Sequence, residues 1–368
     1  MDSKKILFSI FLIVLCFLFA AVGFFNYEKI EAYLYGEVWS YIEPIKDIKG
    51  VSISDITGNN SIITVSAKEL NIYSKIGAKI NTVSSISNTH MLDRDGEYSV
   101  IVANDLNTIY LYKNDSQISN FTIDYEIKSV SVNSNGYIAV IFIQNGYKSG
   151  VKVFSPSGNE QLTTYLANTN AIDCVISNDN KSLYIAEVDM SGIKIKSNIK
   201  IVDLSNIKKS SEKEDNMVSC ELEKDGLVFD IRESSKGLYI SSTNGIYELD
   251  GLNVIKKICS YNEENVLYTS INGKYPIVIE RNKAGDMLLR IYKDQIIERV
   301  LDNVPQGIAV GNKRICLNMG DCIEIINEKG KMISKIDLSN KVVKMLIYRN
   351  GKNLAVVFRD KIEIFSIW

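Results

Sequence analysis

From Gly50 to the C-terminus the sequence repeats a unit of about 40 residues, and this repeat is the feature that most limits the fold. Within each unit, short runs of alternating apolar residues are separated by Gly, Asn, Asp and Ser. An alternation with a period of two is typical of β-strands and not of helices. The sequence therefore predicts an all-β domain built from many small, similar units over residues 50–368.

The unit at residues 128–169 shows the pattern in full. Its predicted elements, in chain order, are a strand at Ser129–Val132, a turn at Asn133–Gly136, a strand at Tyr137–Ile143, a strand at Val151–Phe154, a turn at Pro156–Gly158 and a strand at Gln161–Leu166. Four antiparallel strands in about 40 residues form one blade of a β-propeller.

Eight such units begin at about residues 51, 89, 128, 170, 226, 264, 304 and 341. They predict an eight-bladed β-propeller. Seven blades are the alternative if the first or the last unit does not form a separate blade. The one long spacing, from 170 to 226, contains a polar, charged insertion around Asn206–Met217, which we expect to be an exposed loop.

The last unit contains only three predicted strands before the chain ends at Trp368. A ring of blades has to close, because an open end leaves an unpaired sheet edge and an uncovered apolar face. We therefore expect residues before Gly50, such as Ile45–Ile48, to supply the missing outer strand.

The N-terminal region contains 20 uncharged, mostly apolar residues, Ile6–Phe25. As a helix, a segment of this length spans roughly 30 Å, the hydrocarbon thickness of a bilayer. Lys4 and Lys5 precede it and acidic residues follow it, which favours a cytoplasmic N-terminus and an extracytoplasmic C-terminal domain. A cleaved signal peptide, with a site at Ala21–Gly23, and a buried core helix are the alternatives.

The predicted organisation is therefore a cytoplasmic N-terminus at residues 1–5, a transmembrane helix at 6–25, a juxtamembrane stalk and closing strand at 26–49, and a β-propeller at 50–368. In the stalk, apolar residues from Tyr27 to Tyr41 recur at spacings of three and four, which predicts a short amphipathic helix ended by Pro44. We expect this helix to pack on the propeller or the membrane surface.

Composition limits the partners and the cysteine chemistry. The net charge is −2, which gives no reason to expect nucleic acid as a partner. Cys16 lies in the apolar N-terminal run, and the other five cysteines form no CxxC pair, so we expect buried, reduced thiols. Cys316 and Cys322 would meet across a hairpin only if the turn between them is wide enough.

The sequence contains no recognisable catalytic motif, and we predict no catalytic, cofactor-binding or metal-binding residue. His90 is the only histidine, so a histidine-rich metal centre is excluded. The segment Asp93–Gly96 lacks the full ligand spacing of a calcium loop and is interpreted as a turn. Three or more acidic or amide side chains converging in the channel would favour an enzyme, whereas an apolar or scattered lining would favour a scaffold.

The repeats, with apolar strands of the YIAV or LYIA type followed by strands of the VKVFS or KIVDL type, resemble the YVTN and WD40-like propeller superfamily. Together with the N-terminal segment, the chain is similar to an uncharacterised family of membrane-anchored, extracytoplasmic β-propeller proteins of clostridia. This resemblance implies a binding or scaffold module for protein or cell-envelope partners. The alternative is a propeller hydrolase resembling lactonases, with a channel-facing carboxylate or metal site.

Overall fold

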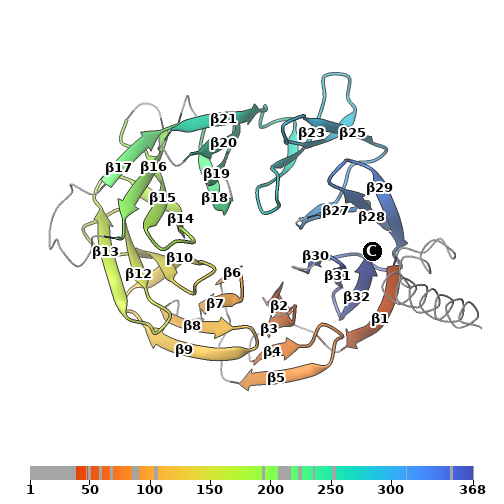
Figure 1. Cartoon of the computed structure of the whole chain (residues 1–368), viewed down its shortest axis with the longest axis horizontal. Coiled ribbons are helices and arrows are strands. Elements are labelled where there is room, and N and C mark those ends of the chain that lie inside the picture. Colours follow the sequence, from red (N-terminus) through yellow and green to blue (C-terminus); the bar gives the residue numbers. More distant parts are fainter. Residues whose placement is uncertain are drawn as a thin grey trace, which may run out of the picture.

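The protein forms a ring of eight antiparallel sheets, each with four strands, in a computed structural model (Figure 1). The structure describes residues 39–46, 48, 51–57, 60–66, 69–84, 91–102, 107–192, 195–205, 217–222, 226–234, 237–250, 254–311, 313–348 and 351–367. The predicted eight-bladed β-propeller is therefore confirmed.

Each blade is formed by four strands that are hydrogen-bonded in order from the channel to the periphery. Blades 1–3 consist of β2 (Val51–Ile56), β3 (Ile62–Ser66), β4 (Glu69–Tyr73) and β5 (Lys79–Ser84); β6 (Met91–Asp95), β7 (Tyr98–Val102), β8 (Thr108–Lys113) and β9 (Ser116–Thr122); and β10 (Glu126–Val132), β11 (Ile138–Ile143), β12 (Ser149–Phe154) and β13 (Glu160–Leu166). Blades 4–6 consist of β14 (Asn170–Ile176), β15 (Ser182–Asp189), β16 (Lys196–Asp203) and β17 (Met217–Glu221); β18 (Val228–Ser234), β19 (Gly237–Ser242), β20 (Gly245–Leu249) and β21 (Ile255–Ser260); and β22 (Val266–Ser270), β23 (Ile277–Arg281), β24 (Met287–Ile291) and β25 (Ile297–Leu301). Blades 7 and 8 consist of β26 (Gly307–Val310), β27 (Arg314–Asn318), β28 (Cys322–Asn327) and β29 (Met332–Asp337); and β30 (Lys344–Ile347), β31 (Asn353–Val357), β32 (Lys361–Ile367) and β1 (Trp39–Lys46).

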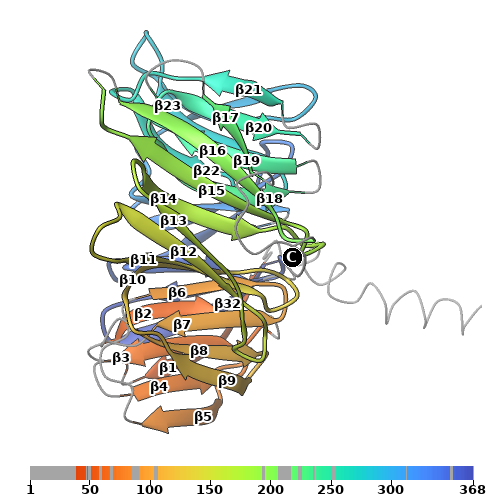
Figure 2. The same ribbon diagram turned by 90° about the vertical axis from the view of Figure 1, so that its left-hand side faces the viewer.

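The two faces of the ring are defined by the strand directions (Figure 2). We call the face on which β1 begins and β32 ends the proximal face, because Trp39 pairs with Ile367 there. The turns that follow each inner strand lie on this same face. The distal face carries the starts of the inner strands and the turns between the second and third strands of each blade.

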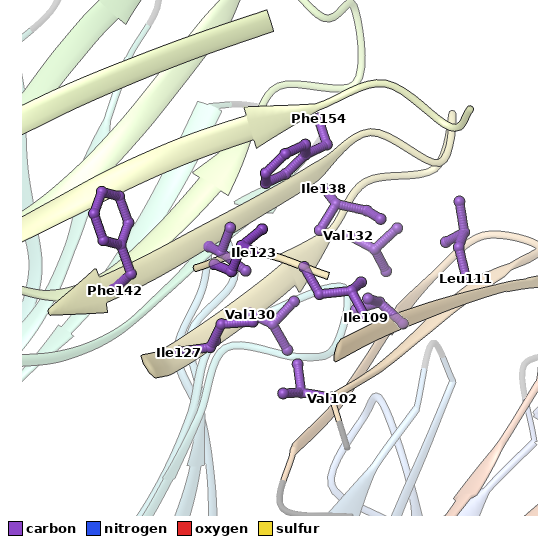
Figure 3. Packing of buried hydrophobic residues seen from close by; sticks show 12 residues of the cluster. Val102, Ile109, Leu111, Ile123, Ile127, Val130, Val132, Ile138, Phe142 and Phe154 are labelled. Atoms are coloured by element: carbon purple, nitrogen blue, oxygen red, sulfur yellow. The ribbon is translucent and has the colours of Figure 1, made fainter. Parts of the chain in front are cut away.

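The hydrophobic core is divided into eight clusters, one between each pair of neighbouring blades. Figure 3 shows the cluster between blades 2 and 3, where Val102 and Ile109 lie close to Val130. The alternating apolar residues of both sheet faces supply these clusters, since each blade is covered on both sides by a neighbour. Burial of these side chains stabilises the ring at every blade contact.

Strand β1 closes the ring by pairing with β32, so the outer strand of the last blade comes from residues before Gly50. Ile45 and Ile48, both 4% exposed, pack in the cluster that joins blade 8 to blade 1. Backbone hydrogen bonds and apolar contacts therefore hold residues 39–46 and 48 against the C-terminal blade.

The predicted helix is wrong over its last turn, because Trp39–Lys46 form a strand that includes both Tyr41 and Pro44. The register of β1 shifts between Ile42 and Ile45, and such an irregularity on an outer strand accommodates Pro44, which has no amide hydrogen to donate. The rest of the predicted stalk, residues 26–38, lies outside the described residues.

The segment Asp93–Gly96 is also placed differently from the prediction. Asp93, Arg94 and Asp95 belong to the inner strand β6, and the turn follows at Gly96, where φ is +58°. Turn-forming residue types are tolerated in this strand because inner strands border the channel. His90 and the insertion at residues 206–216 lie outside the described residues.

No disulfide joins the described cysteines. Cys174, Cys259, Cys316 and Cys322 are buried, as predicted, whereas Cys220 is half-buried. Cys316 pairs with Ile325 and Cys322 with Asp337, so the two thiols do not meet across the hairpin. No helix in the described part of the chain has the length and apolarity to cross a membrane. The predicted transmembrane segment, residues 6–25, lies outside that part.

The ring closure makes a prediction about stability. We expect Ile45→Ala to lower the free energy of unfolding by about 2–4 kcal/mol, because it opens a cavity in the cluster between blades 8 and 1. Ile296→Ala, at a side chain that is 56% exposed, is the matched control and should change it by less than about 0.5 kcal/mol. Urea unfolding of the full chain in detergent measures both. Equal effects of the two variants would contradict the role of β1 in closure.

Candidate functional site

Charged side chains from three blades gather in the central channel around Arg232 of β18. Its Nη1 lies 3.2 Å from Asp93 Oδ1 on β6, and its Nε lies 3.3 Å from Asp230 Oδ1 on its own strand. Asp173 on β14 is the third carboxylate within electrostatic reach. Arg232 therefore links blade 5 to blade 2 across the channel.

Two of these carboxylates also bind backbone amides of the next blade. Asp93 Oδ2 accepts a hydrogen bond of 2.9 Å from the amide of Val132, and Asp173 Oδ2 accepts one of 3.1 Å from the amide of Ile231. Hydrogen bonds of this kind, from an amide to a charged acceptor, are stronger than neutral ones. Asp93 and Asp173 therefore join neighbouring inner strands as well as surrounding Arg232.

Burial and neighbouring charges shift the pKa values of Arg232 and of two of the carboxylates around it. Burial alone would lower the pKa of Arg232, but the carboxylates of Asp93, Asp230 and Asp173 outweigh burial and raise it. Burial raises the pKa of Asp173 to about 7, although Arg232 and two backbone amides oppose the shift. Burial raises the pKa of Asp230 as well, again against the charge of Arg232.

Polar contacts between inner strands continue around the proximal end of the channel. Glu233 Oε2 accepts a 2.7 Å hydrogen bond from the amide of Asn178, which joins blade 5 to blade 4. Burial raises the pKa of Glu233 to about 7. On the other side of the ring, Arg94 Nε lies 2.8 Å from Asp55 Oδ1, joining blade 2 to blade 1.

At the level of the sequence, three or more acidic or amide side chains converging in the channel would favour an enzyme. Three carboxylates do converge at Arg232, so the number is reached. Each of the three contacts Arg232 electrostatically, and two of them also hold a backbone amide of the next blade. The described residues contain no cluster of histidine, cysteine and carboxylate side chains arranged to hold a metal ion. The arrangement is that of an internal ion-pair network that fixes the inner strands.

A second candidate site is a patch of exposed apolar side chains on the distal face of blades 3–5. Each of these side chains lies near a strand end on the distal face or in a turn there, and each is 39–57% exposed. They are Ile143, Tyr147, Tyr165, Ile172, Met190, Ile195 and Phe229. We call this set the distal patch. Exposed apolar groups concentrated on one face are typical of a surface that binds a partner.

β-Bulges expose two members of the distal patch. The pairing of β14 with β15 shifts between Ala171 and Asp173, and the pairing of β18 with β19 shifts between Val228 and Asp230. The residues inserted at these points are Ile172, 40% exposed, and Phe229, 48% exposed. A bulge redirects a side chain that regular pairing would place differently, so both apolar groups reach the surface.

The aromatic part of the distal patch is held in place by a series of ring contacts. Tyr147 stacks on Tyr165 with ring centroids 4.6 Å apart, and Tyr165 meets buried Phe142 edge-to-face at 6.0 Å. Gly150 permits this arrangement, because a Cβ there would lie 2.3 Å from Phe142 Cζ. The two exposed rings are thus fixed from the interior, which lowers the entropy lost on binding.

Neither site follows from local sequence patterns. Arg232 and Asp93 are 139 residues apart, and only the closed ring brings them together. The signal that pointed toward the channel was the charged segment Asp93–Asp95, which we interpreted as a turn. For the distal patch, we identified no signal in the sequence, although Tyr147 lies between the predicted strands Tyr137–Ile143 and Val151–Phe154.

The chain belongs to a family of unknown function, DUF5711, which it matches over residues 40–367. Among solved structures, it is similar to BamB from Moraxella catarrhalis, with 12% identity, a TM-score of 0.53, and coverage of 90% of this chain and 98% of that one. It is also similar to the C-terminal WD40 domain of Sif2, with 12% identity, a TM-score of 0.62, and coverage of 90% and 99%.

A third similar structure is a eukaryotic initiation factor, with 11% identity, a TM-score of 0.55, and coverage of 89% of this chain and 87% of that one. No curated protein matches the chain. These likenesses agree with the β-propeller fold of the chain. At such low identity they show the fold alone.

The raised pKa of Glu233 predicts how stability changes with pH. The folded-state pKa of about 7 exceeds the ordinary value of 4.5, so the folded protein favours the protonated acid. The resulting stabilisation is complete below about pH 4.5 and is lost as the pH rises through about 7. Glu233→Gln, which keeps an acceptor for the Asn178 amide, should reduce this loss by on the order of 1–2 kcal/mol, less than the full pKa shift implies because solvent screens the partly exposed carboxyl group.

Urea unfolding at pH 4.5 and at pH 7.5 measures the difference between wild type and variant. Glu264→Gln, at an exposed carboxyl group in the loop before β22, is the matched control for removal of one negative charge. If both variants keep the pH dependence of the wild type, Glu233 does not have the assigned role.

Proposed function

We propose that this protein is a membrane-anchored, extracytoplasmic β-propeller that binds protein or cell-envelope partners through its distal patch. The observation that carries the proposal is the concentration of exposed aromatic and aliphatic side chains on the face opposite the start of β1, where ring contacts fix Tyr147 and Tyr165. Tyrosine is enriched among the residues that dominate binding energy at protein interfaces.

The anchoring part of the proposal rests on the sequence. Residues 6–25 contain no charge, two lysines precede them, and 13 residues (26–38) separate them from β1. Fully extended, 13 residues span about 45 Å at most. An anchor at residues 6–25 would hold the proximal face toward the membrane and direct the distal patch away from it.

Partner binding predicts site-dependent photo-crosslinking. We expect a photoreactive amino acid in place of Tyr147 to give discrete crosslinked species in intact cells, because this ring would lie in the interface. The matched control is the same replacement at Val300, an apolar side chain on the outer strand β25 that is 60% exposed. Mass spectrometry of the adducts identifies the partner, and Tyr165→Ser should reduce their yield roughly tenfold.

The two positions together decide the outcome. If both capture the same set of abundant membrane proteins, or if neither captures any, the distal patch is not a binding surface. A discrete adduct that forms only at Val300 would also contradict the proposal.

A second candidate function is a hydrolase that uses the channel, and the observation that favours it is the convergence of three carboxylates. Asp173, with a pKa raised to about 7 by burial, would suit a general base near neutral pH. Asp173→Asn should then lower the rate of lactone or ester hydrolysis by about a hundredfold or more. Asp179→Asn, at an exposed proximal turn, is the control. The absence of hydrolysis by the wild type, or an undiminished rate in Asp173→Asn, would reject this candidate.

A further inference from the structure

A shallow basic notch lies between blades 6 and 7 on the proximal face. The notch is open to solvent, and the space that it encloses is only about 10 Å³. Its polar lining comes from the turn before β23, from the turn before β27 and from the turn after β28: Lys274, Tyr275, Lys313, Arg314 and Glu328. The first of these turns belongs to blade 6 and the other two belong to blade 7, so the notch forms only where the two blades pack side by side.

The positive charges of the notch are not balanced within the described residues. Glu328, the only acidic lining residue, lies 3.9 Å from Lys293 Nζ, so its charge is matched from outside the lining set. Among the described residues, no carboxylate lies within ion-pair distance of Lys274 or Lys313. The lining therefore carries three cationic groups, Lys274, Lys313 and Arg314, against the single carboxylate of Glu328, which also attracts Lys274.

Arg314 contributes a buried hydrogen-bond donor that has no acceptor in the described part of the chain. Its Nη1 donates a hydrogen bond of 3.1 Å to the carbonyl oxygen of Lys313. Its Nε is inaccessible to solvent and has no hydrogen-bond acceptor among the described residues. A buried donor without an acceptor costs free energy, and a bound ion is one of the ordinary ways in which it is satisfied.

Tight packing shapes the floor of the notch. A Cβ at Gly311, which lines the notch, would lie 2.7 Å from Ile347 Cγ2, and one at Gly273 would lie 2.6 Å from Val310 Cγ1. Glycine at position 273 lets blade 6 approach blade 7 closely, and glycine at position 311 lets blade 7 approach blade 8 closely. Tyr275 is held between two cations, with Lys274 Nζ at 5.1 Å and Lys293 Nζ at 4.6 Å from its ring centre.

We infer that this notch binds a phosphate group, with Arg314, Lys274 and Lys313 as its cationic ligands. A guanidinium group presents donors in a geometry that suits phosphate oxygens, and two lysines supply further charge. The proximal face is the one on which β1 begins, at Trp39. A phosphate on this face could come from a lipid headgroup or from a phosphorylated solute, and the chemistry of the site is the same for both.

Calorimetric titration of the full chain in a neutral detergent, with inorganic phosphate at low ionic strength, tests the site. We expect saturable binding that the double variant Lys274→Gln, Lys313→Gln weakens at least about tenfold. The control double variant is Lys256→Gln, Lys283→Gln, which removes the same charge from exposed positions elsewhere. Arg314→Gln should also weaken binding, and the lysine variants keep the test informative if this variant fails to fold.

The inference is overturned if phosphate gives no saturable binding, or if the two double variants bind with equal affinity. A second arm identifies the source of the phosphate. Phosphatidylglycerol in the micelles should shift the isotherm by competition if the notch binds lipid headgroups, whereas an unchanged isotherm assigns it to soluble phosphates. The distal patch takes no part in this measurement, so its result is independent of crosslinking at Tyr147.

Discussion

The apolar contact between neighbouring blades is the interaction on which this structure depends. A single four-stranded sheet with apolar residues on both faces has no stable arrangement in water until both faces are covered. Eight clusters, one at every blade contact, meet this requirement only because the ring closes. Pairing of β1 with β32 supplies the closing hydrogen bonds, and both strands add apolar side chains to the cluster between blades 8 and 1, so this pairing stabilises the whole ring.

The repeat and the number of blades could be predicted from the sequence because they are local properties: strand alternation and turns such as Asn133–Gly136 recur at a fixed spacing. The closing strand shows where local pattern fails. Apolar residues up to Tyr41 fit a helical spacing, yet Tyr41 pairs with Phe365 at the other end of the chain. Tertiary pairing outweighed a weak local preference, and nothing near Tyr41 in the sequence records its partner.

The candidate sites could be predicted even less, since each combines residues from different blades. In the sequence, Arg232 is one charged residue in an alternating run, and only the folded ring places it beside Asp93. Asp93 itself belongs to a segment that is typical of turns, and its place in β6 follows from the polar channel that it borders. The basic notch likewise combines turns from two blades, although its individual lysines are ordinary surface residues in the sequence.

The two faces of the propeller differ in a way that the proposed anchoring would explain. The proximal face carries the basic notch, and the distal face of blades 3–5 carries the fixed aromatic rings. If residues 6–25 are an anchor, the 13 residues between them and β1 would favour the proximal face, on which β1 begins, as the face nearer the bilayer. Cationic groups are favoured near anionic lipid headgroups, and exposed aromatic groups are suited to binding a protein partner. The different chemistry of the two faces therefore matches the orientation that an N-terminal anchor would impose on the ring.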